Sequence, residues 1–229
     1  SKIDFKPHRD VMGKILYIGI PIAVQDGLIQ VAFIVITIIA NQRGLNDAAA
    51  VGIVEKIISF LFLVPSSMLS TVSALGAQNI GANKPERAIA TLRYAVLIAV
   101  GFGILATITI QFTAGSIVSL FTDGNTSAGA DVIRLGSQYL RGYIFDCIFA
   151  GIHFSFSGYF CACQKSILSF IHNIIAILLV RVPGVYLTSK LFSNTLFPMG
   201  LATATGSLLS VIICVIAFLI LTRKEKHIA

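Results

Sequence analysis

Charged side chains are scarce in this sequence. Asp, Glu, Lys and Arg together make up 12% of its 229 residues, whereas a soluble domain averages about 25%. Hydrophobic residues account for 56% of the chain, and the mean hydropathy is +0.89. This composition excludes a soluble globular domain and indicates an integral membrane protein.

Cysteines and enzyme signatures are also few. The four cysteines, Cys147, Cys161, Cys163 and Cys214, all lie in apolar stretches, so we expect packing residues and no disulfide framework. Cys161 and Cys163 are two positions apart on a predicted helix and point to different sides, which argues against a shared metal. His-Glu-x-x-His, Gly-x-Ser-x-Gly, phosphate-loop and Cys-x-x-Cys motifs are all missing. We therefore expect neither enzymatic activity nor an organic cofactor.

What the sequence has in abundance is long apolar runs. Six of them could each cross the roughly 30 Å of membrane hydrocarbon as a helix, at about 15–40, 51–77, 89–112, 137–162, 166–191 and 199–222. Their length excludes the strands of about 10 residues that build an outer-membrane barrel. The sequence thus predicts an all-α integral membrane protein with six transmembrane helices and no sizeable soluble domain.

The net charge of +7 follows the loops and forms no patch, so it does not predict nucleic-acid binding. On the side of the amino terminus lie Lys2, Lys6, Arg9, Lys14, Lys84, Arg87, Lys165, Arg223, Lys224 and Lys226. The opposite side has Arg43 and Arg134, with Arg141 and Lys190 near span ends. By the positive-inside rule both termini are cytoplasmic, in a multi-pass protein of the inner (plasma) membrane.

The segments outside the spans are short, with one exception. Residues 1–14 are basic and amphipathic, consistent equally with a linker on the cytoplasmic membrane surface and with a solvated loop, and residues 223–229 form a basic tail. The longest predicted loop, 113–136, contains an Asp-Gly turn and lies outside. Since the sequence starts without methionine and without a signal peptide, we expect it to begin within a longer protein.

Two charged residues are predicted at the same depth on consecutive helices. At about 1.5 Å per residue, Asp146 lies about 14 Å below the outer end of the fourth span and Arg181 about 15 Å below that of the fifth. In one interpretation they form a buried ion pair that orders the bundle. In the other, which we favour, Asp146 binds a proton or Na⁺ in exchange for a cationic substrate, and Arg181 tunes that affinity.

The first span adds a polar inner half. Asp26 lies close to the membrane midplane, next to Gln25 and one turn before Gln30. Such a face needs protein or water around it. Ion or substrate binding is the functional interpretation of these residues, and simple hydrogen bonding within the bundle is the alternative.

The remaining polar residues of the spans are weaker candidates. His153 follows Asp146 by two helical turns on the same face, where it could relay protons, contact substrate or simply pack. Glu55 and Lys56 are expected near the outer surface, where a solvated or snorkelling position is favoured.

The segment GAQNIGANKPERA at 76–88 resembles the Gly-x-x-Asn-x-Gly-Ala turn that follows the second helix of each half in the multidrug and toxic compound extrusion (MATE) family of antiporters. Four other marks agree in order and spacing: Gly19-Ile-Pro21, Phe145-Asp146, Arg181-Val-Pro183 and Pro198-Met-Gly-Leu-Ala202. The resemblance extends over the whole membrane region, from about Lys14 to Thr222.

The resemblance implies one six-helix lobe of a twelve-helix transporter. Its partner would be an amino-terminal six-helix lobe, in the same or a separate chain, or a second copy in a homodimer. The implied function is export of organic cations or drugs in exchange for H⁺ or Na⁺, with a cation-coupling acid at Asp146. Some branches carry a Glu eight residues after the proline of the first helix, where this chain has Ile29. That departure leaves both Na⁺ at Asp146 and H⁺ open.

Two other functions compete with drug export. A flippase or exporter of lipid-linked sugars would need several deep cationic side chains for pyrophosphate, and here Arg181 is the one deep cation that the sequence predicts. A non-transporting membrane assembly module would show no ion-coupled flux with any partner chain.

Overall fold

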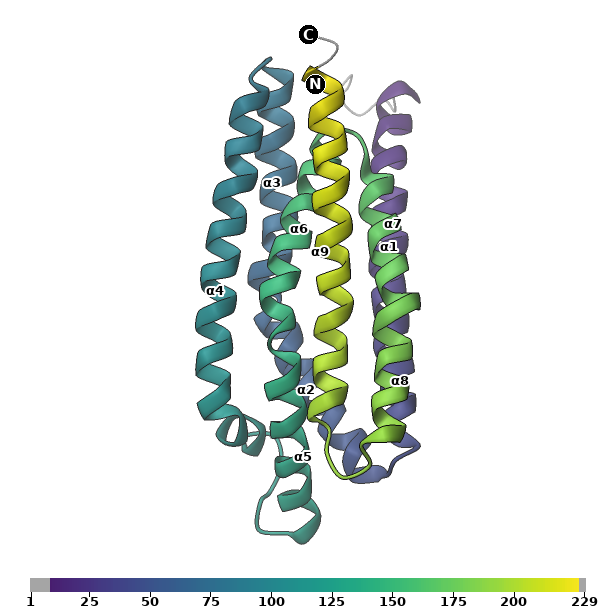
Figure 1. Ribbon diagram of the computed structural model, residues 1–229, viewed down its shortest axis with the longest axis vertical. Coiled ribbons are helices and arrows are strands. Elements are labelled where there is room, and N and C mark those ends of the chain that lie inside the picture. Colours follow the sequence, from purple (N-terminus) through teal and green to yellow (C-terminus); the bar gives the residue numbers. More distant parts are fainter. Residues whose placement is uncertain (1–8, 227–229) are drawn as a thin grey trace, which may run out of the picture.

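Helices make up every regular element that the computed structural model describes, from residue 9 to residue 226. In chain order these are α1 (Arg9–Asn41), α2 (Leu45–Leu61), α3 (Leu63–Gly81), α4 (Pro85–Ser119), α5 (Ser127–Tyr143), α6 (Asp146–Ala162), α7 (Ser166–Ala176), the π-helical turn η2 (Ile177–Arg181), α8 (Val182–Leu191) and α9 (Phe197–Lys226). Five continuous stretches are long and apolar enough to cross a membrane, and α5 with α6, bent by 42°, makes a sixth. The stretches run alternately up and down through one bundle (Figure 1).

The helices extend beyond the ends that hydropathy predicts. The predicted long loop 113–136 is wrong, because α4 continues to Ser119 and α5 already begins at Ser127. Thr126 caps α5, its hydroxyl accepting the Gly129 N–H at 3.0 Å. At the amino end, residues 9–14 of the predicted linker are helical and the rest of it lies outside the described residues. The predicted tail is helical through Lys226, and residues 227–229 also lie outside them.

Two of the crossing stretches are interrupted at prolines. A proline has no N–H and its ring crowds the carbonyl four residues earlier, which disfavours a regular helix there. Pro65 follows the break between α2 and α3 at Phe62. Pro183 follows η2, in which the Val182 N–H bonds the Ile177 carbonyl five residues back. Pro21, in contrast, lies inside an unbroken α1.

Two matching turns join helices at the end of the bundle where α1 begins and α9 ends (Figure 1). In the α3–α4 turn Asn83 has φ 55° and the Lys84 N–H bonds the Asn79 carbonyl at 2.9 Å. In the α6–α7 turn Gln164 has φ 58° and the Lys165 N–H bonds the Phe160 carbonyl at 2.7 Å. Both are Schellman-type helix ends. The left-handed position of the 76–88 segment is therefore Asn83, and not one of its glycines.

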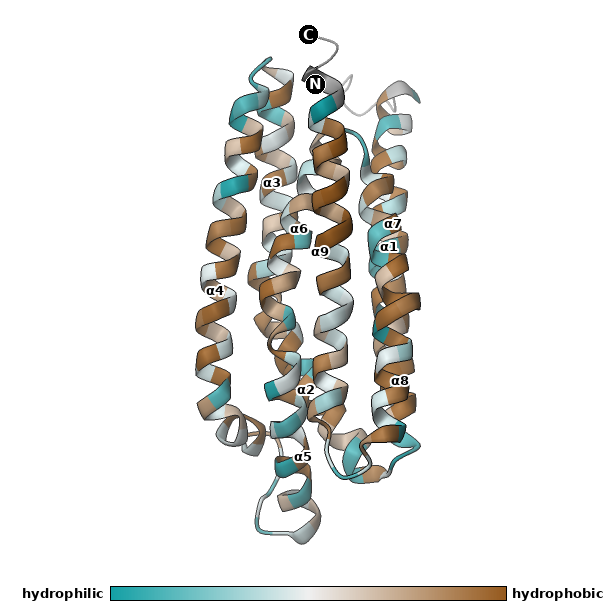
Figure 2. Ribbon diagram, in the orientation of Figure 1, coloured by the Kyte–Doolittle hydropathy of each residue, from teal (hydrophilic) through white to brown (hydrophobic). Residues whose placement is uncertain are grey.

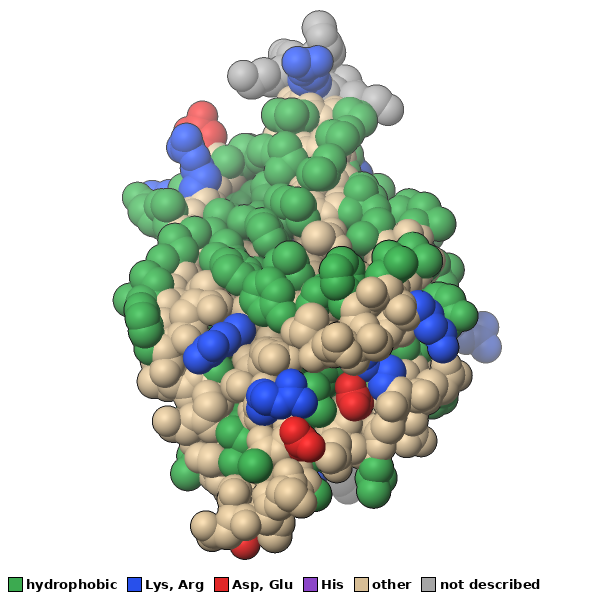
Figure 3. Space-filling view, turned by 60° about the horizontal axis from the view of Figure 1, so that its bottom comes forward, with side chains coloured by type: hydrophobic (Ala, Val, Ile, Leu, Met, Phe, Trp, Pro, Cys, Tyr) green, Lys and Arg blue, Asp and Glu red, His purple; other side chains and the backbone are tan. Residues whose placement is uncertain are grey.

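The backbones of α5 and α9 come into close contact where α5 ends and α9 begins. Gly142 and Gly200 face each other, and a Cβ added to Gly200 would lie 2.7 Å from the Tyr143 amide nitrogen. Small residues allow such approach where lipid supplies no hydrophobic force between helices. Apolar side chains cover the flanks, and charged side chains gather at the ends (Figures 2 and 3).

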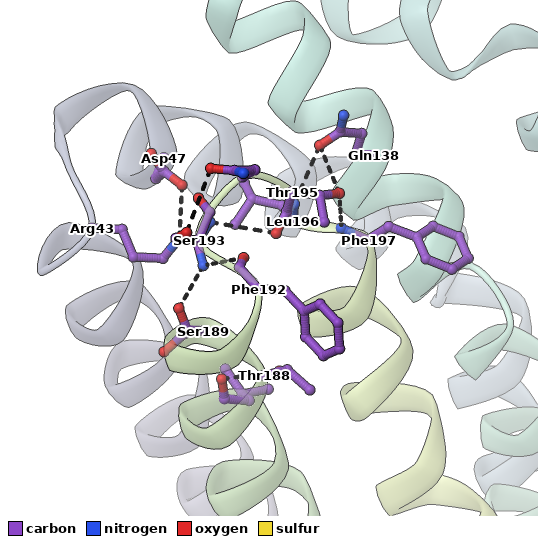
Figure 4. Close-up of polar contacts among 12 residues, drawn as sticks. Arg43, Asp47, Gln138, Thr188, Ser189, Phe192, Ser193, Thr195, Leu196 and Phe197 are labelled. Atoms are coloured by element: carbon purple, nitrogen blue, oxygen red, sulfur yellow. Dashed lines mark hydrogen bonds and ion pairs between the residues drawn. The ribbon is translucent and has the colours of Figure 1, made fainter.

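Arg43 ties the far end of the bundle together (Figure 4). Its guanidinium donates to the carbonyls of Ser189, Phe192 and Ser193 at 2.7, 3.0 and 2.7 Å, and pairs with Asp47 at 2.9 Å. The last carbonyls of a helix have no partners within the helix, so this cation satisfies those at the end of α8. It thereby joins the end of α1 to the α8–α9 loop.

Candidate functional site

Three interrupted helices meet at one level of the bundle. Phe62, at the α2–α3 break, packs edge-on against Tyr143 at the end of α5, with ring centroids 6.4 Å apart. Arg181, the last residue of η2, donates to the Tyr143 hydroxyl and pairs with Asp146 at 3.3 Å. The two residues that the sequence places at equal depth therefore form a buried ion pair.

Asp146 is held at the start of a helix. It is the first residue of α6, directly after the bend between α5 and α6, and none of its surface is exposed. The positive end of the helix dipole favours a carboxylate in this first turn. One carboxylate oxygen faces Arg181, and the other, Oδ1, has no hydrogen-bond partner among the described residues. The acid is therefore fully buried, with Arg181 and the Ser207 side chain as its polar neighbours.

Arg181 is stacked as well as paired. Its guanidinium carbon lies 5.4 Å from the centre of the Phe33 ring and 5.6 Å from that of Tyr143. Both distances are within cation–π range. Gly206 of α9 lies against Arg181 of η2, and a Cβ added to this glycine would be 2.9 Å from the Arg181 Cβ. A glycine at 206 therefore gives the arginine its room.

A cavity of about 290 Å³ opens beside this pair. Its walls come from α1, α2, α6, η2 and their neighbours: Asp26, Ile29, Gln30, Phe33, Ile58, Ser59, Phe62, His153, Phe154, Asn173, Arg181 and Ser207. The volume is near the lower limit for small-molecule sites, about 300 Å³. Aromatic walls with a few polar groups suit a small organic ion.

Asp26 and Gln30, at the mouth, are both exposed, and Asp26 does not face the closed interior of the lobe. Gln25, the third predicted residue of this helix, is buried away from the cavity and accepts the Ser169 hydroxyl at 2.7 Å. Asp26 and Gln30 of α1 therefore border the cavity, whereas Gln25 belongs to the contact between α1 and α7.

His153 belongs to a buried polar cluster of α6 and α7. Its ring lies 5.5 Å from that of His172, whose Nε2 is 2.9 Å from the Ser157 hydroxyl. Among the described residues, the Nδ1 atoms of both histidines and the Asn173 side-chain nitrogen have no hydrogen-bond partner. Buried polar atoms are seldom left unpaired, which makes this cluster a place for ordered water.

Glu55 departs from the solvated position that the sequence predicts. Lys56 is exposed, but Glu55 is half-buried and accepts the Thr37 hydroxyl at 3.2 Å. Its other oxygen is buried without a partner among the described residues. Glu55 lies one helical turn before Ser59, which lines the cavity, so a second acid borders the site.

Of the predicted site residues, the cavity and its ion pair bring together Asp26, Gln30, Asp146, His153 and Arg181. Sequence reasoning missed Glu55, Tyr143, Phe33 and His172. Tyr143 alone had a usable signal, since it lies about one turn before Asp146. The other three come from other helices, and their proximity depends on packing.

The MatE family model matches residues 21–187. Probable multidrug resistance protein YoeA of Bacillus subtilis (strain 168) is 28% identical over 116 residues, which cover 51% of this chain and 25% of that protein. Most of the Bacillus subtilis protein therefore lies outside the aligned region.

Solved structures share the fold. One described as the outward-facing conformation of a multidrug resistance MATE family transporter of the MOP superfamily has a TM-score of 0.85 at 18% identity, over 97% of this chain and 49% of the other. A MOP superfamily transporter from Pyrococcus furiosus, described as having a binding pocket of reverse polarity, has a TM-score of 0.84 at 18% identity, covering 96% and 48%. The chain spans about half the length of these structures. With the family match running from the proline of α1 into α8, the chain belongs to the MatE family, the multidrug and toxic compound extrusion transporters.

Proposed function

We propose that this chain forms one transport lobe of a secondary active exporter, which moves organic cations or drugs out of the cell in exchange for H⁺ or Na⁺. The observation that carries the proposal is the Asp146–Arg181 pair, buried beside an aromatic cavity inside a membrane-spanning lobe. Ionisable residues at such depth are costly and mark ion or substrate paths.

Exchange requires that the two transported species compete. One carboxylate cannot hold a proton or Na⁺ and an organic cation at full strength at the same time, because each neutralises the charge that attracts the other. We assign this shared charge to Asp146, which does not line the cavity itself but pairs with Arg181 at the cavity wall. Phe33, Phe62 and Phe154 supply apolar walls for a flat cation. The lobe thus contains the parts of a competitive site.

Alternating access needs a second lobe against which this one can move. We propose that the partner is an amino-terminal six-helix lobe, in the same or another chain, or a second copy of this one. The exposed cavity mouth with Asp26 and Gln30 is the part that a partner lobe would shield from lipid. The basic residues at the end where α1 begins support placing that end in the cytoplasm, in the inner (plasma) membrane.

The test is ion-driven efflux of a cationic dye from cells or proteoliposomes that carry the complete transporter. Asp146→Asn should abolish efflux while the protein still inserts and folds. The matched control is Asp131→Asn, which removes an exposed carboxylate paired with Arg134 at 3.3 Å. Undiminished efflux by the Asp146 variant, with a proton or a sodium gradient, would remove the basis of the proposal.

Export of a lipid-linked sugar is the second candidate, because Arg181 and not Asp146 lines the cavity. Among the described lining residues, however, Arg181 is the one Arg or Lys, whereas a pyrophosphate calls for several such cations. Stabilisation of the purified transporter by an anionic polyisoprenoid pyrophosphate, and not by organic cations, would favour this candidate.

A further inference from the structure

We propose that the chain fills a cation site with its own guanidinium: Arg181 occupies the site of Asp146, Tyr143 and Phe33, and an incoming planar cation of the amidinium or guanidinium class displaces it toward Glu55. The inference rests on the proposed function, since it names the ligand class and the competitor at that same site. It treats Arg181 as a tethered ligand.

The surroundings of Arg181 are those expected of a bound organic cation. A carboxylate lies 3.3 Å from one guanidinium nitrogen, and aromatic rings lie 5.4 and 5.6 Å from the central carbon. Aromatic faces with a carboxylate are the usual recognition elements for organic cations. Arg181 also borders the cavity, so a soluble cation can reach the position that it holds.

Arg181 has a second acid available. Glu55 lies one helical turn before Ser59, which lines the same cavity as Arg181, and keeps one buried oxygen unpaired among the described residues. The hydroxyl of Thr37, one turn after Phe33, donates to the other Glu55 oxygen at 3.2 Å. The Arg181 Nε also has no hydrogen-bond partner among the described residues. A guanidinium that leaves Asp146 for Glu55 therefore stays paired, and the newcomer takes over Asp146. No charge is stranded in either state.

If Arg181 is a tethered competitor, removing it should change the binding affinity for a soluble cation in the opposite direction to that expected of a structural residue. A group on a short tether acts at a high effective concentration, in the millimolar range or above for short flexible tethers, so a soluble cation must overcome it before binding. Removing the tethered group should tighten binding of the soluble cation. If Arg181 only orders the bundle, or receives an anion, its removal should weaken binding or leave it unchanged.

The experiment is calorimetric titration of the complete purified transporter with benzamidinium, without an ion gradient. Benzamide, a neutral molecule of the same shape, is the control ligand. Arg181→Ala should bind benzamidinium about tenfold more tightly than the unmodified protein, and benzamide no better. The double variant Arg181→Ala/Asp146→Asn should lose this gain. Folded Arg181→Ala with equal or weaker benzamidinium binding would overturn the inference.

A second variant covers the case in which Arg181→Ala does not fold. Glu55→Gln leaves Arg181 in place but removes its alternative partner, so benzamidinium should bind about tenfold more weakly. Glu86→Gln, at the exposed start of α4, is the matched control and should bind as the unmodified protein does. Unchanged affinity of Glu55→Gln for benzamidinium would overturn the proposed movement of the Arg181 guanidinium from Asp146 to Glu55. Because binding is measured without a gradient, tightened binding in a protein that shows no ion-driven efflux would overturn the proposed function and leave this inference standing.

Discussion

A double-mutant cycle on Asp146 and Arg181 measures how strongly the two buried charges depend on each other. The variants are Asp146→Asn, which is nearly isosteric, Arg181→Gln, which removes the charge and shortens the side chain, and the two combined. Opposite unit charges about 4 Å apart attract by about 4 kcal/mol at an effective dielectric constant of about 20. Breaking a buried pair by removing one partner typically destabilises a protein by about 3–5 kcal/mol. The nitrogen–oxygen distance of 3.3 Å and the complete burial of Asp146 place this pair in that class.

We expect Arg181→Gln to lower the free energy of unfolding by about 3 kcal/mol, because it strands the Asp146 carboxylate. Asp146→Asn should lower it by less, because Arg181 can then pair with Glu55. The double change removes both charges and should be more stable than the sum predicts, by about 1–3 kcal/mol. Reversible unfolding in mixed detergent micelles supplies the free energies. The matched control is the exposed Asp131–Arg134 pair, for which the same cycle should give less than about 1 kcal/mol.

Additive costs at 146 and 181 would refute the reasoning. Additivity would mean that each charge is stabilised by something other than its partner, such as water in the cavity. The stability of the protein would then not depend on attraction between Asp146 and Arg181, even though their side chains lie 3.3 Å apart. A coupling energy equal to that of the exposed control pair would lead to the same conclusion.

Two further predictions concern the packing around the site and the end of the bundle. Arg43→Ala should lower the free energy of unfolding by about 2–4 kcal/mol, because it leaves carbonyls at the end of α8 and in the α8–α9 loop unpaired. The control Arg134→Ala, on the surface, should change this free energy by less than about 0.5 kcal/mol. Unfolding of both variants in detergent micelles measures the difference. Gly206→Ala puts a methyl group 2.9 Å from the Arg181 Cβ and should destabilise by about 1–3 kcal/mol with loss of dye efflux. Gly101→Ala on α4, with no atom within 4 Å of the added carbon, should do neither, and equal effects of the two glycine variants would contradict the packing argument.

The number of helical crossings was predictable because hydrocarbon thickness sets a minimum apolar length, and six runs meet it. Their ends were not, because hydropathy detects where a chain leaves lipid and not where a helix stops. The stretch 113–119 is the clearest case: its Thr, Gly and Ser residues indicate a loop, yet α4 continues through them. The hydrogen bonds within a helix can form in water as well as in lipid. A helix can therefore continue beyond the end of its apolar stretch.

The proximity of Asp146 and Arg181 was predictable, since they lie on consecutive antiparallel helices at equal distance from one surface. From the sequence, an ion-coupling role for Asp146 was nevertheless favoured over a structural ion pair. Glu55 was placed wrongly for a related reason. Counting residues gives the height of a residue along a helix but not the direction in which its side chain points. A buried carboxylate oxygen at this height depends on the packing of α1 against α2, through Thr37.

The three helix breaks explain why the chemistry collects at one level. Two have a visible sequence cause, Pro65 and Pro183, but the bend between Tyr143 and Asp146 has none in its own segment. Beside this bend Gly142 of α5 lies against Gly200 of α9, and α6 leaves at 42°. Each interruption ends one helix and starts another, so it places a helix terminus or a wider turn inside the membrane, where continuous helices offer no free polar backbone. Asp146 uses such a terminus, and Arg181 ends such a turn. Prolines in two helices and a glycine contact in a third thus converge on one site, and a change in the angle of any of these breaks alters the distance between the acid and the guanidinium.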